Sequence, residues 1–477
     1  MAEERSYLEL SQDEGVAHKF YEVTINDTEV TIRYGRIGDK GTSKTTSYAD
    51  NAKAKAFADK KLREKRRKGY EDAVMGVRKK RAITRRQIDS KPATTKSKAP
   101  LVWKFSTGRS AFGVFVDDEL CWVGNEAGRI FALNHEGQVQ RQFKLPDGVK
   151  CLVADDEWRY AGCDDGTVYD ISGKAPLAAY DISEDVDIYW LDIRDGVLGV
   201  SDAKGFVVMI NHEDESHWQK KSDGRSGWMV RCDEIGVYHG HSLGLTMYDW
   251  EDGSVVWSHR LPSAVLFGWQ EESTIYAACA NRIVYQYTKQ GHKGHEFKCD
   301  AAVFSCAAAE DGKYVFAGDN CSSIYCFDST GKRLWKMATG CGSAFSMQFH
   351  NDRLFVVTTD GSLACYDVSD EAIKGAESGQ TFDAKIIAAP AATADVAPTT
   401  SVDTVAASAV SSGVVVECYK EGSRLRVRPV GDGFNAGWHV QFPKHLREAG
   451  ARYVVEALKE SSRGGFYRAS GDIKKLV

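Results

Sequence analysis

A short apolar strand that ends in acidic residues recurs seven times in the middle of the chain. The last acidic residues of successive copies are 38, 39, 39, 38, 39 and 41 residues apart. They are Asp118, Asp156, Asp195, Glu234, Glu272, Asp311 and Asp352. A second anchor, a small residue before a later strand, repeats at intervals of 38, 39, 39, 37, 41 and 39 residues. Its members are Gly128, Gly166, Gly205, Gly244, Asn281, Ser322 and Gly361. Two anchors that agree over seven copies indicate one repeated supersecondary unit.

Each repeat contains about four alternating apolar runs separated by turn residues. In the first unit the runs read AFGVFV, ELCWVG, RIFALN and VQRQFKL. The turns contain Asp-Gly, Glu-Gly or Asp-Asp, which suit hairpins. Four strands in about 40 residues are typical of a propeller blade, and the absence of helical periodicity excludes an α-solenoid.

The two ends of the repeat region predict how the ring closes. The segment LVWKFSTG at residues 101–108 resembles RLWKMATG at residues 333–340, whereas the seventh unit ends near Val368 without a Trp-bearing fourth strand. The strand 101–105 is therefore expected to complete the last blade, which removes two open sheet edges. The sequence predicts a seven-bladed β-propeller over residues 101–370.

The fourth runs of the repeats carry tryptophans at matching places. YDWEDGSVVWSHRLP and FDSTGKRLWKMATG resemble the tryptophan repeats of the PQQ-like propeller superfamily, a WD-type architecture. The resemblance and the large apolar area of the indole predict that these side chains pack between blades rather than bind a ligand. The four tryptophans concerned are Trp103, Trp218, Trp257 and Trp335.

Charge is distributed unevenly, although the formal net charge is only −5. Residues 1–100 carry 24 Lys/Arg and 15 Asp/Glu, a net charge of +9. Residues 101–413 carry 26 and 45, a net of −19, and residues 414–477 carry 12 and 7, a net of +5. Strand alternation places the acidic first-to-second turns of all repeats on one face of the disc. These acidic residues either serve turns and solubility, or form a negative face that repels nucleic acid or docks a basic partner.

The N-terminal block, residues 1–75, is predicted to be a small sheet against a basic helix. Two alternating runs, AHKFYEV and TEVTIRYGR, are joined by the turn-forming Asn26-Asp27, and Asp50 is suited to cap the helix that follows. KFYEVTINDTEVTIRYGRIGDKGTSKTTSY, with the Ala/Lys-rich helix and its K-G-Y end, resembles a WGR domain, as found in poly(ADP-ribose) polymerases and molybdate-regulator-like bacterial proteins. In this chain Tyr34-Gly35-Arg36 replaces Trp-Gly-Arg.

The resemblance implies a set of nucleic-acid-binding residues. Tyr34 would be the ring that packs on a sugar at a DNA end, and Arg36 a backbone or structural contact. Lys19, Lys40 and Lys44 would contact phosphates. Clustered cations and an exposed ring also suit nucleic acid on physical grounds. The alternative is that Tyr34 belongs to the sheet core and that the lysines form a solvated surface.

Two segments have the composition of linkers. Residues 76–100 are basic and polar, and residues 371–412 are rich in Ala, Thr and Pro, so the latter is expected to be flexible. Residues 413–477 are predicted to form a small basic α+β domain. Its arginines at 424, 426 and 428 alternate along one strand and its aromatic residues interleave with basic ones, a mixture that suits either nucleic acid or an aromatic core with a basic surface.

Catalytic signals are weak throughout the chain. His239 with His241, and His292 with His295, lack a third ligand at metal spacing, and no nucleophile or phosphate-loop motif is present. No metal, cofactor or enzymatic activity is therefore expected. No apolar stretch reaches membrane-spanning length, and the N-terminus lacks the pattern of a signal peptide. The 12 cysteines without a CxxC suit a reducing cytoplasm, or a nucleus if the source is eukaryotic.

Three functions remain open. The first is a non-enzymatic adaptor that binds nucleic acid through the WGR-like domain and an unidentified protein through the propeller. The resemblance favours DNA over RNA, and DNA ends or breaks in particular. The second is a protein-interaction scaffold without nucleic-acid binding. A quinoprotein-like enzyme fits worst, because such enzymes usually have eight blades and are exported.

Overall fold

The chain folds into two compact units, residues 1–82 and 83–477. The computed structural model describes residues 4–10, 19–36, 41–72, 89–182, 188–378, 384–391, 394–406, 408 and 412–477. No helix among them is long and apolar enough to cross a membrane.

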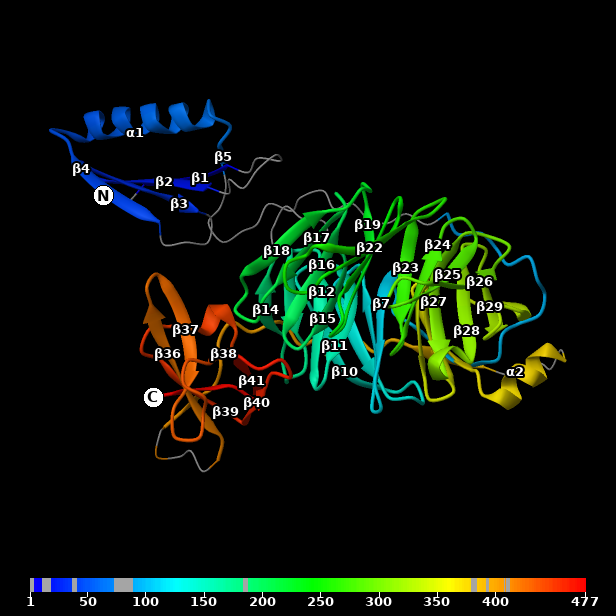
Figure 1. Cartoon of the computed structure of the whole chain (residues 1–477). Helices are drawn as coiled ribbons and strands as arrows, with labels where there is room; N and C mark the ends of the chain where they lie inside the picture. Colours follow the sequence, from blue (N-terminus) through cyan, green and yellow to red (C-terminus); the bar gives the residue numbers. More distant parts are fainter. Residues whose placement is uncertain are drawn as a thin grey trace. The chain divides into compact units, whose positions relative to one another are not determined.

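The first unit is a five-stranded sheet in the order β4-β3-β2-β1-β5, with helix α1 across one face (Figure 1). Its elements are β1 (Glu4–Leu10), β2 (Lys19–Asn26), β3 (Glu29–Arg36), β4 (Thr42–Ser47), α1 (Asn51–Arg66) and β5 (Glu71–Asp72). Asp50 caps α1 as predicted, because its carboxylate accepts a hydrogen bond of 2.8 Å from the Lys53 amide. Ala54, Ala58 and Leu62, spaced four residues apart, are buried against the sheet.

The second unit contains seven antiparallel four-stranded blades, so the predicted seven-bladed propeller is confirmed. The first strands of neighbouring blades contact one another and therefore line the central channel. Strands of blades one to four are β7 (Ala111–Val116), β8 (Cys121–Asn125), β9 (Arg129–Leu133), β10 (Val139–Lys144); β11 (Val149–Asp155), β12 (Trp158–Cys163), β13 (Thr167–Asp170), β14 (Leu177–Asp181); β15 (Ile188–Arg194), β16 (Val197–Asp202), β17 (Phe206–Ile210), β18 (Ser216–Lys221); β19 (Gly227–Cys232), β20 (Val237–His241), β21 (Gly244–Tyr248) and β22 (Val255–Arg260).

The seventh blade closes the ring with a strand from the start of the propeller sequence. Strands of blades five to seven are β23 (Val265–Gln270), β24 (Thr274–Cys279), β25 (Ile283–Thr288), β26 (Lys293–Lys298); β27 (Val303–Ala309), β28 (Tyr314–Asp319), β29 (Ser323–Asp328), β30 (Arg333–Ala338); β31 (Ala344–His350), β32 (Arg353–Thr358), β33 (Ser362–Asp367) and β6 (Leu101–Ser106). Strand β6 pairs antiparallel with β33, with Trp103 opposite Cys365. The closing strand is therefore the predicted one, one residue longer.

Both sequence anchors occupy turns that need special backbone. Gly128, Gly166, Gly205 and Gly361 have φ values between 80° and 85°, where a side chain is disfavoured. The acidic anchors lie in the first-to-second turns, and four of them (Asp156, Asp195, Asp311 and Asp352) also have positive φ. Because Asp tolerates this region better than most residues, part of the acidity of this face follows from turn geometry.

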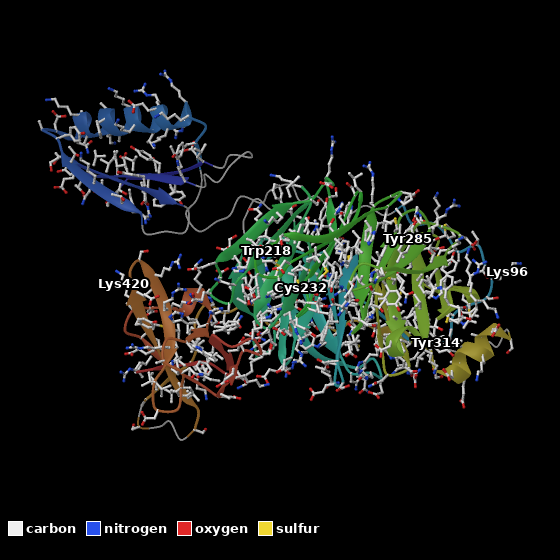
Figure 2. The ribbon with its side chains drawn as sticks, viewed as in Figure 1. Lys96, Trp218, Cys232, Tyr285, Tyr314 and Lys420 are labelled. Carbon is white, nitrogen blue, oxygen red and sulfur yellow. The ribbon has the colours of Figure 1, made fainter. Side chains whose placement is uncertain are left out.

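The repeated tryptophans join neighbouring blades. The indole Nε1 of Trp103 donates to the carbonyl of His135 at 2.8 Å, and the same bond links Trp218 to Trp250 and Trp257 to Lys289. In each case donor and acceptor are 32 residues apart. Figure 2 shows Trp218 among the side chains that fill the space between the ribbons. The predicted packing role agrees with the full or partial burial of these side chains, and three of the four indoles add a hydrogen bond that the sequence did not predict.

The two predicted linkers differ from expectation, because their described parts lie along blade edges. Residues 89–100 follow blade six, where the amide of Ala99 and the carbonyl of Ser97 both bond to Ala338. After helix α2 (Asp370–Glu377), strand β34 (Lys385–Ala388) pairs parallel to β6 and becomes a fifth strand of blade seven. Val396 then exchanges two backbone hydrogen bonds with the outer strand β10. The low-complexity composition of the second linker did not indicate that its residues are ordered. Their backbone hydrogen-bond partners come from the open edges of the blades and not from the linker itself.

The C-terminal block differs from the predicted α+β domain, since its described residues 412–477 form strands and a single 3₁₀ turn. Its elements are β36 (Val414–Glu421), β37 (Arg424–Pro429), β38 (His439–Gln441), the turn η4 (Lys444–Leu446), β39 (Arg452–Val455), β40 (Ala457–Glu460), β41 (Phe466–Ser470) and β42 (Lys474–Leu476). Strand β35 (Thr404–Val405), from the segment before it, pairs with β42. Gly450, with φ of 80°, lies in a left-handed turn just before β39.

The C-terminal block packs on the acidic turns of blades two to four, so it is not a separate module connected only by a flexible linker. Arg468 forms a buried ion pair with Asp155 at 2.6 Å, and its guanidinium lies 3.7 Å from the ring centroid of Trp158. Arg426 makes a buried ion pair with Glu213. Asp195 accepts hydrogen bonds from the Ser461 hydroxyl and from two backbone amides.

These contacts show what the basic and aromatic residues of the C-terminal block do. Arg424 and Arg426 pair with Glu215 and Glu213 of the propeller, and Phe466 stacks on His212 at 3.8 Å. Arg428 instead pairs with Glu417, and Phe442, Tyr453 and Tyr467 belong to the core of the block itself. The acidic face thus docks a basic partner, and on blades two to four that partner is the chain itself. The sequence could not show this, because the paired residues are more than 200 positions apart.

Candidate nucleic-acid interface

The register of the N-terminal sheet decides which predicted residues share a face. Tyr34 on β3 lies opposite Tyr21 on β2, and Lys19 lies opposite Arg36. Residues directly opposite one another in an antiparallel pair point to the same side of the sheet. This side carries α1, because Tyr21 and its neighbours on that face pack with the helix.

Tyr34 is not a core residue: 47% of its surface is exposed. Its ring lies against that of Tyr21, with centroids 6.4 Å apart and planes 26° apart. Tyr21 in turn meets Tyr70 edge-on at 6.4 Å, just beyond the end of α1. Burial raises the pKa of Tyr21, and the nearby Glu64, Tyr34 and Tyr70 raise it further. The alternative that Tyr34 belongs to the sheet core is therefore wrong. Its exposed ring packs on the buried ring of Tyr21.

Lysines gather around this aromatic group. The Lys65 ammonium lies 4.4 Å from the ring centroid of Tyr21 and 4.9 Å from that of Tyr70. Burial lowers the pKa of Lys65, and the positive charges of Lys68, Lys19 and Lys61 lower it further. The effect of the neighbouring lysines on Lys65 shows that positive charge is concentrated here. We call Tyr34, Tyr21, Lys19, Lys65 and Lys68 the tyrosine–lysine cluster.

The lysines of the cluster are available to a ligand. Among the described residues, Lys19, Lys65 and Lys68 form no salt bridge, whereas Arg5 and Arg33 on the opposite face of the sheet both pair with the buried Glu22. Three unneutralised ammonium groups beside an exposed ring suit phosphates flanking a stacked base or sugar.

The other predicted site residues are only partly placed. Lys44 lies on the edge strand β4 opposite Ile32, so it is exposed on the helix-bearing face of the sheet. Arg36 ends β3, and its side chain lies outside the described residues, as does the whole of Lys40. Sequence reasoning missed Lys65, Lys68 and Tyr21 as site residues. The signal was present in the basic run at the end of α1 and in the K-G-Y sequence that follows it.

The glycine of the motif has a steric role. A Cβ on Gly35 would lie 2.7 Å from the Cα of Gly41, and one on Gly41 would lie 2.7 Å from the Tyr34 carbonyl oxygen. The ends of β3 and β4 can therefore approach only because both residues lack side chains. This close approach fixes the backbone that presents Tyr34.

Comparison with known proteins agrees with both parts of the fold. Residues 4–77 match the WGR domain family, so the chain carries a WGR domain. Residues 244–442 match the family described as outer membrane protein assembly factor BamB, a PQQ-like repeat, and that match extends beyond the propeller into the C-terminal block. No curated protein is significantly similar to the chain in sequence.

Two solved structures illustrate the likeness of the propeller. The WD40 β-propeller domain of Doa1 is 12% identical, with a TM-score of 0.50 over 58% of this chain and 99% of that domain. The computationally designed protein Ika8 is 14% identical, with a TM-score of 0.47 over 57% of this chain and all of that one. The first supports the propeller fold and nothing further. A WGR domain together with a propeller suggests a binding or adaptor role.

Proposed function

We propose that the protein is a non-enzymatic adaptor whose WGR domain binds nucleic acid at the tyrosine–lysine cluster. The observation that supports this most is the exposed Tyr34 ring, which is seated on Tyr21 and flanked by lysines that form no salt bridge among the described residues. Stacking on Tyr34 tolerates any base, so the affinity depends mainly on the lysines and falls with salt. The resemblance of the domain favours DNA, at ends or breaks, over RNA.

The propeller supplies the second half of the adaptor. The C-terminal block covers acidic turns of blades two to four, whereas those of blades five, six, seven and one stay exposed. Their exposed acidic residues are Glu272, Asp311, Asp352 and Asp118. We propose that a basic protein surface binds there, by the same charge complementarity that holds the C-terminal block. Nucleic acid is excluded from this face by repulsion.

A salt titration of the full chain tests the nucleic-acid proposal. Fluorescence anisotropy is measured with blunt duplex, nicked duplex, single-stranded DNA and RNA of equal length. Removing two phosphate contacts with Lys65→Ala/Lys68→Ala should reduce the slope of log K against log salt by about 1.8 on duplex DNA. Tyr34→Ala should weaken binding by about 1–3 kcal/mol with little change in slope.

The same helix provides the matched control. Lys53→Ala/Lys55→Ala removes the same charge about 15 Å away, at the other end of α1. It should leave the slope nearly unchanged. Absence of binding to all four probes at low salt would leave the scaffold function, without nucleic acid, as the better account.

A further inference from the structure

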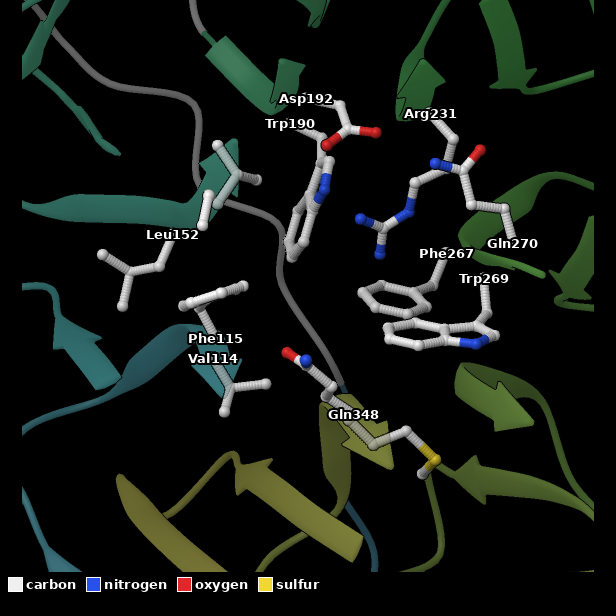
Figure 3. A pocket seen from close by; sticks show the side chains of 13 residues that line it. Val114, Phe115, Leu152, Trp190, Asp192, Arg231, Phe267, Trp269, Gln270 and Gln348 are labelled. Carbon is white, nitrogen blue, oxygen red and sulfur yellow. The ribbon is translucent and has the colours of Figure 1, made fainter. Parts of the chain in front are cut away.

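The central channel of the propeller opens into a cavity of about 210 Å³ at its acidic face (Figure 3). Its lining comes from the middle and last residues of six inner strands, on the side of the first-to-second turns. At ~30 Å³ per water molecule the space corresponds to roughly seven waters, more than the ~150 Å³ that holds a benzene. Phe115, Trp190, Phe267 and Trp269 form its aromatic walls.

Arg231 places a guanidinium group among these rings. Its central carbon lies 5.9 Å from the ring centroid of Trp190, 5.4 Å from Phe267 and 5.6 Å from Trp269. Its Nε donates to the carbonyl of Gly268 at 2.9 Å, which fixes the direction of the group. Its two terminal nitrogens donate no hydrogen bond to the described residues, and Figure 3 shows them pointing into the cavity. A rigid fork of free donors is the geometry that binds a carboxylate in two places.

Asp192 supplies the opposite charge in the same cavity. The carboxylate extends beside Trp190 and Arg231 in Figure 3, and one of its oxygens accepts a hydrogen bond of 2.8 Å from the Cys232 amide. Burial raises the pKa of Asp192 to about 6, although the charge of Arg231 acts against the rise. The nearby charge of Arg231 favours the ionised form of this carboxylate. The cavity thus presents one cation, one anion and four aromatic walls.

We propose that this cavity binds a free α-amino acid with an apolar side chain. The carboxylate of the ligand pairs with the terminal nitrogens of Arg231, its ammonium with Asp192, and its side chain lies against the indole and phenyl rings. The site does not suit nucleotides, because a single cation behind a ring of acidic turns cannot neutralise several phosphates. It does not suit a metal ion either, because Asp192 is the only carboxylate among the described residues that line it. This proposal does not depend on nucleic-acid binding by the WGR domain.

Calorimetric titration of the full chain with L-phenylalanine and L-leucine, up to about 10 mM, tests the site. N-acetyl-L-phenylalanine lacks the ammonium and L-phenylalaninamide lacks the carboxylate. Each analogue should bind at least about tenfold more weakly than L-phenylalanine, which corresponds to about 1.4 kcal/mol. These ligand changes need no protein variant, so they decide the matter even if a variant fails to fold.

Two variants then assign the contacts. Arg231→Met should weaken L-phenylalanine at least about tenfold. Asp192→Asn should abolish the preference for L-phenylalanine over its N-acetyl form. Arg225→Met, which removes an exposed arginine outside the cavity, is the control and should leave binding unchanged. The proposal is overturned if neither amino acid binds, if both analogues bind as well as the parent, or if Arg225→Met and Arg231→Met lose affinity equally.

Discussion

Replacing Arg468 should loosen the C-terminal block from the propeller. The ion pair with Asp155 is 2.6 Å long and its side chains are 4% and 5% exposed. Arg468 also donates to Gln441 at 3.0 Å and stacks on Trp158. Among the residues that the structure describes, Arg468→Met leaves the buried Asp155 carboxylate with the Gly196 amide as its remaining hydrogen-bond donor. Removing one partner of a buried pair costs about 3–5 kcal/mol.

Hydrogen exchange measured by mass spectrometry reports this opening directly. At about 1.4 kcal/mol per tenfold, amides of β38 and β41 should exchange about 10²- to 4 × 10³-fold faster in Arg468→Met than in the parent chain. Asp155→Asn in the same chain should recover part of the loss, because the buried charge is then gone.

A nearby surface pair serves as the control. Lys459 and Asp156 lie in the same interface at 2.9 Å, but their side chains are 44% and 66% exposed. Such pairs contribute about 0–1 kcal/mol, so Lys459→Met should change exchange less than about tenfold. If Arg468→Met were no worse than Lys459→Met, the block would not be held by buried charge, and the docking argument would be refuted.

Three further predictions concern other parts of the chain. Gly35→Ala should destabilise the WGR domain by about 1–3 kcal/mol, seen as faster exchange in β2 and β3, because its Cβ would lie 2.7 Å from the Cα of Gly41. Gly173→Ala is the control and should change little, because the nearest atom to its Cβ would be the Ala175 carbonyl oxygen at 3.9 Å, an ordinary contact. All 12 cysteines are free and ten are buried, so a thiol reagent should label native protein at no more than Cys321 and Cys341. Burial raises the pKa of Asp192 from 3.8 to about 6, so the folded protein holds this proton more tightly than the unfolded chain does. The resulting contribution to the free energy of unfolding is complete below about pH 4 and is lost as the pH rises through 6. In Asp192→Asn this contribution is absent, so the free energy of unfolding, measured by urea denaturation, should fall by about 3 kcal/mol less between pH 4 and 7 than in the parent chain. An equal pH dependence in the two proteins would contradict this.

The propeller was predictable because its signals are local and repeated. The glycine anchors mark positive-φ turns in every blade where they occur, and the tryptophan of strand β6 identified the strand that closes the ring. The docking of Arg468 on Asp155 was not predictable, since nothing in either local sequence specifies the other. Strand β34 was missed for the same reason: Ile387 packs against blade seven, although its own segment has the composition of a coil.

The candidate site was predictable in part. The WGR resemblance led to Tyr34 and Lys19, which the register of β2 and β3 brings to one face. Lys65 and Lys68 belong to a run of basic residues in which most side chains simply face water. The structure shows which lysines of this run lie beside the exposed ring, because Tyr21 packs against Tyr34 and Lys65 lies over Tyr21.

The central claim, that nucleic acid binds the tyrosine–lysine cluster, is tested most directly by hydrogen exchange of the full chain with and without saturating duplex DNA. Protection is expected at the end of β3, the start of β2 and the last turns of α1, and none at the exposed acidic turns of blades five to seven. Protection confined to the C-terminal block or the propeller, with the end of α1 unchanged, would contradict the account.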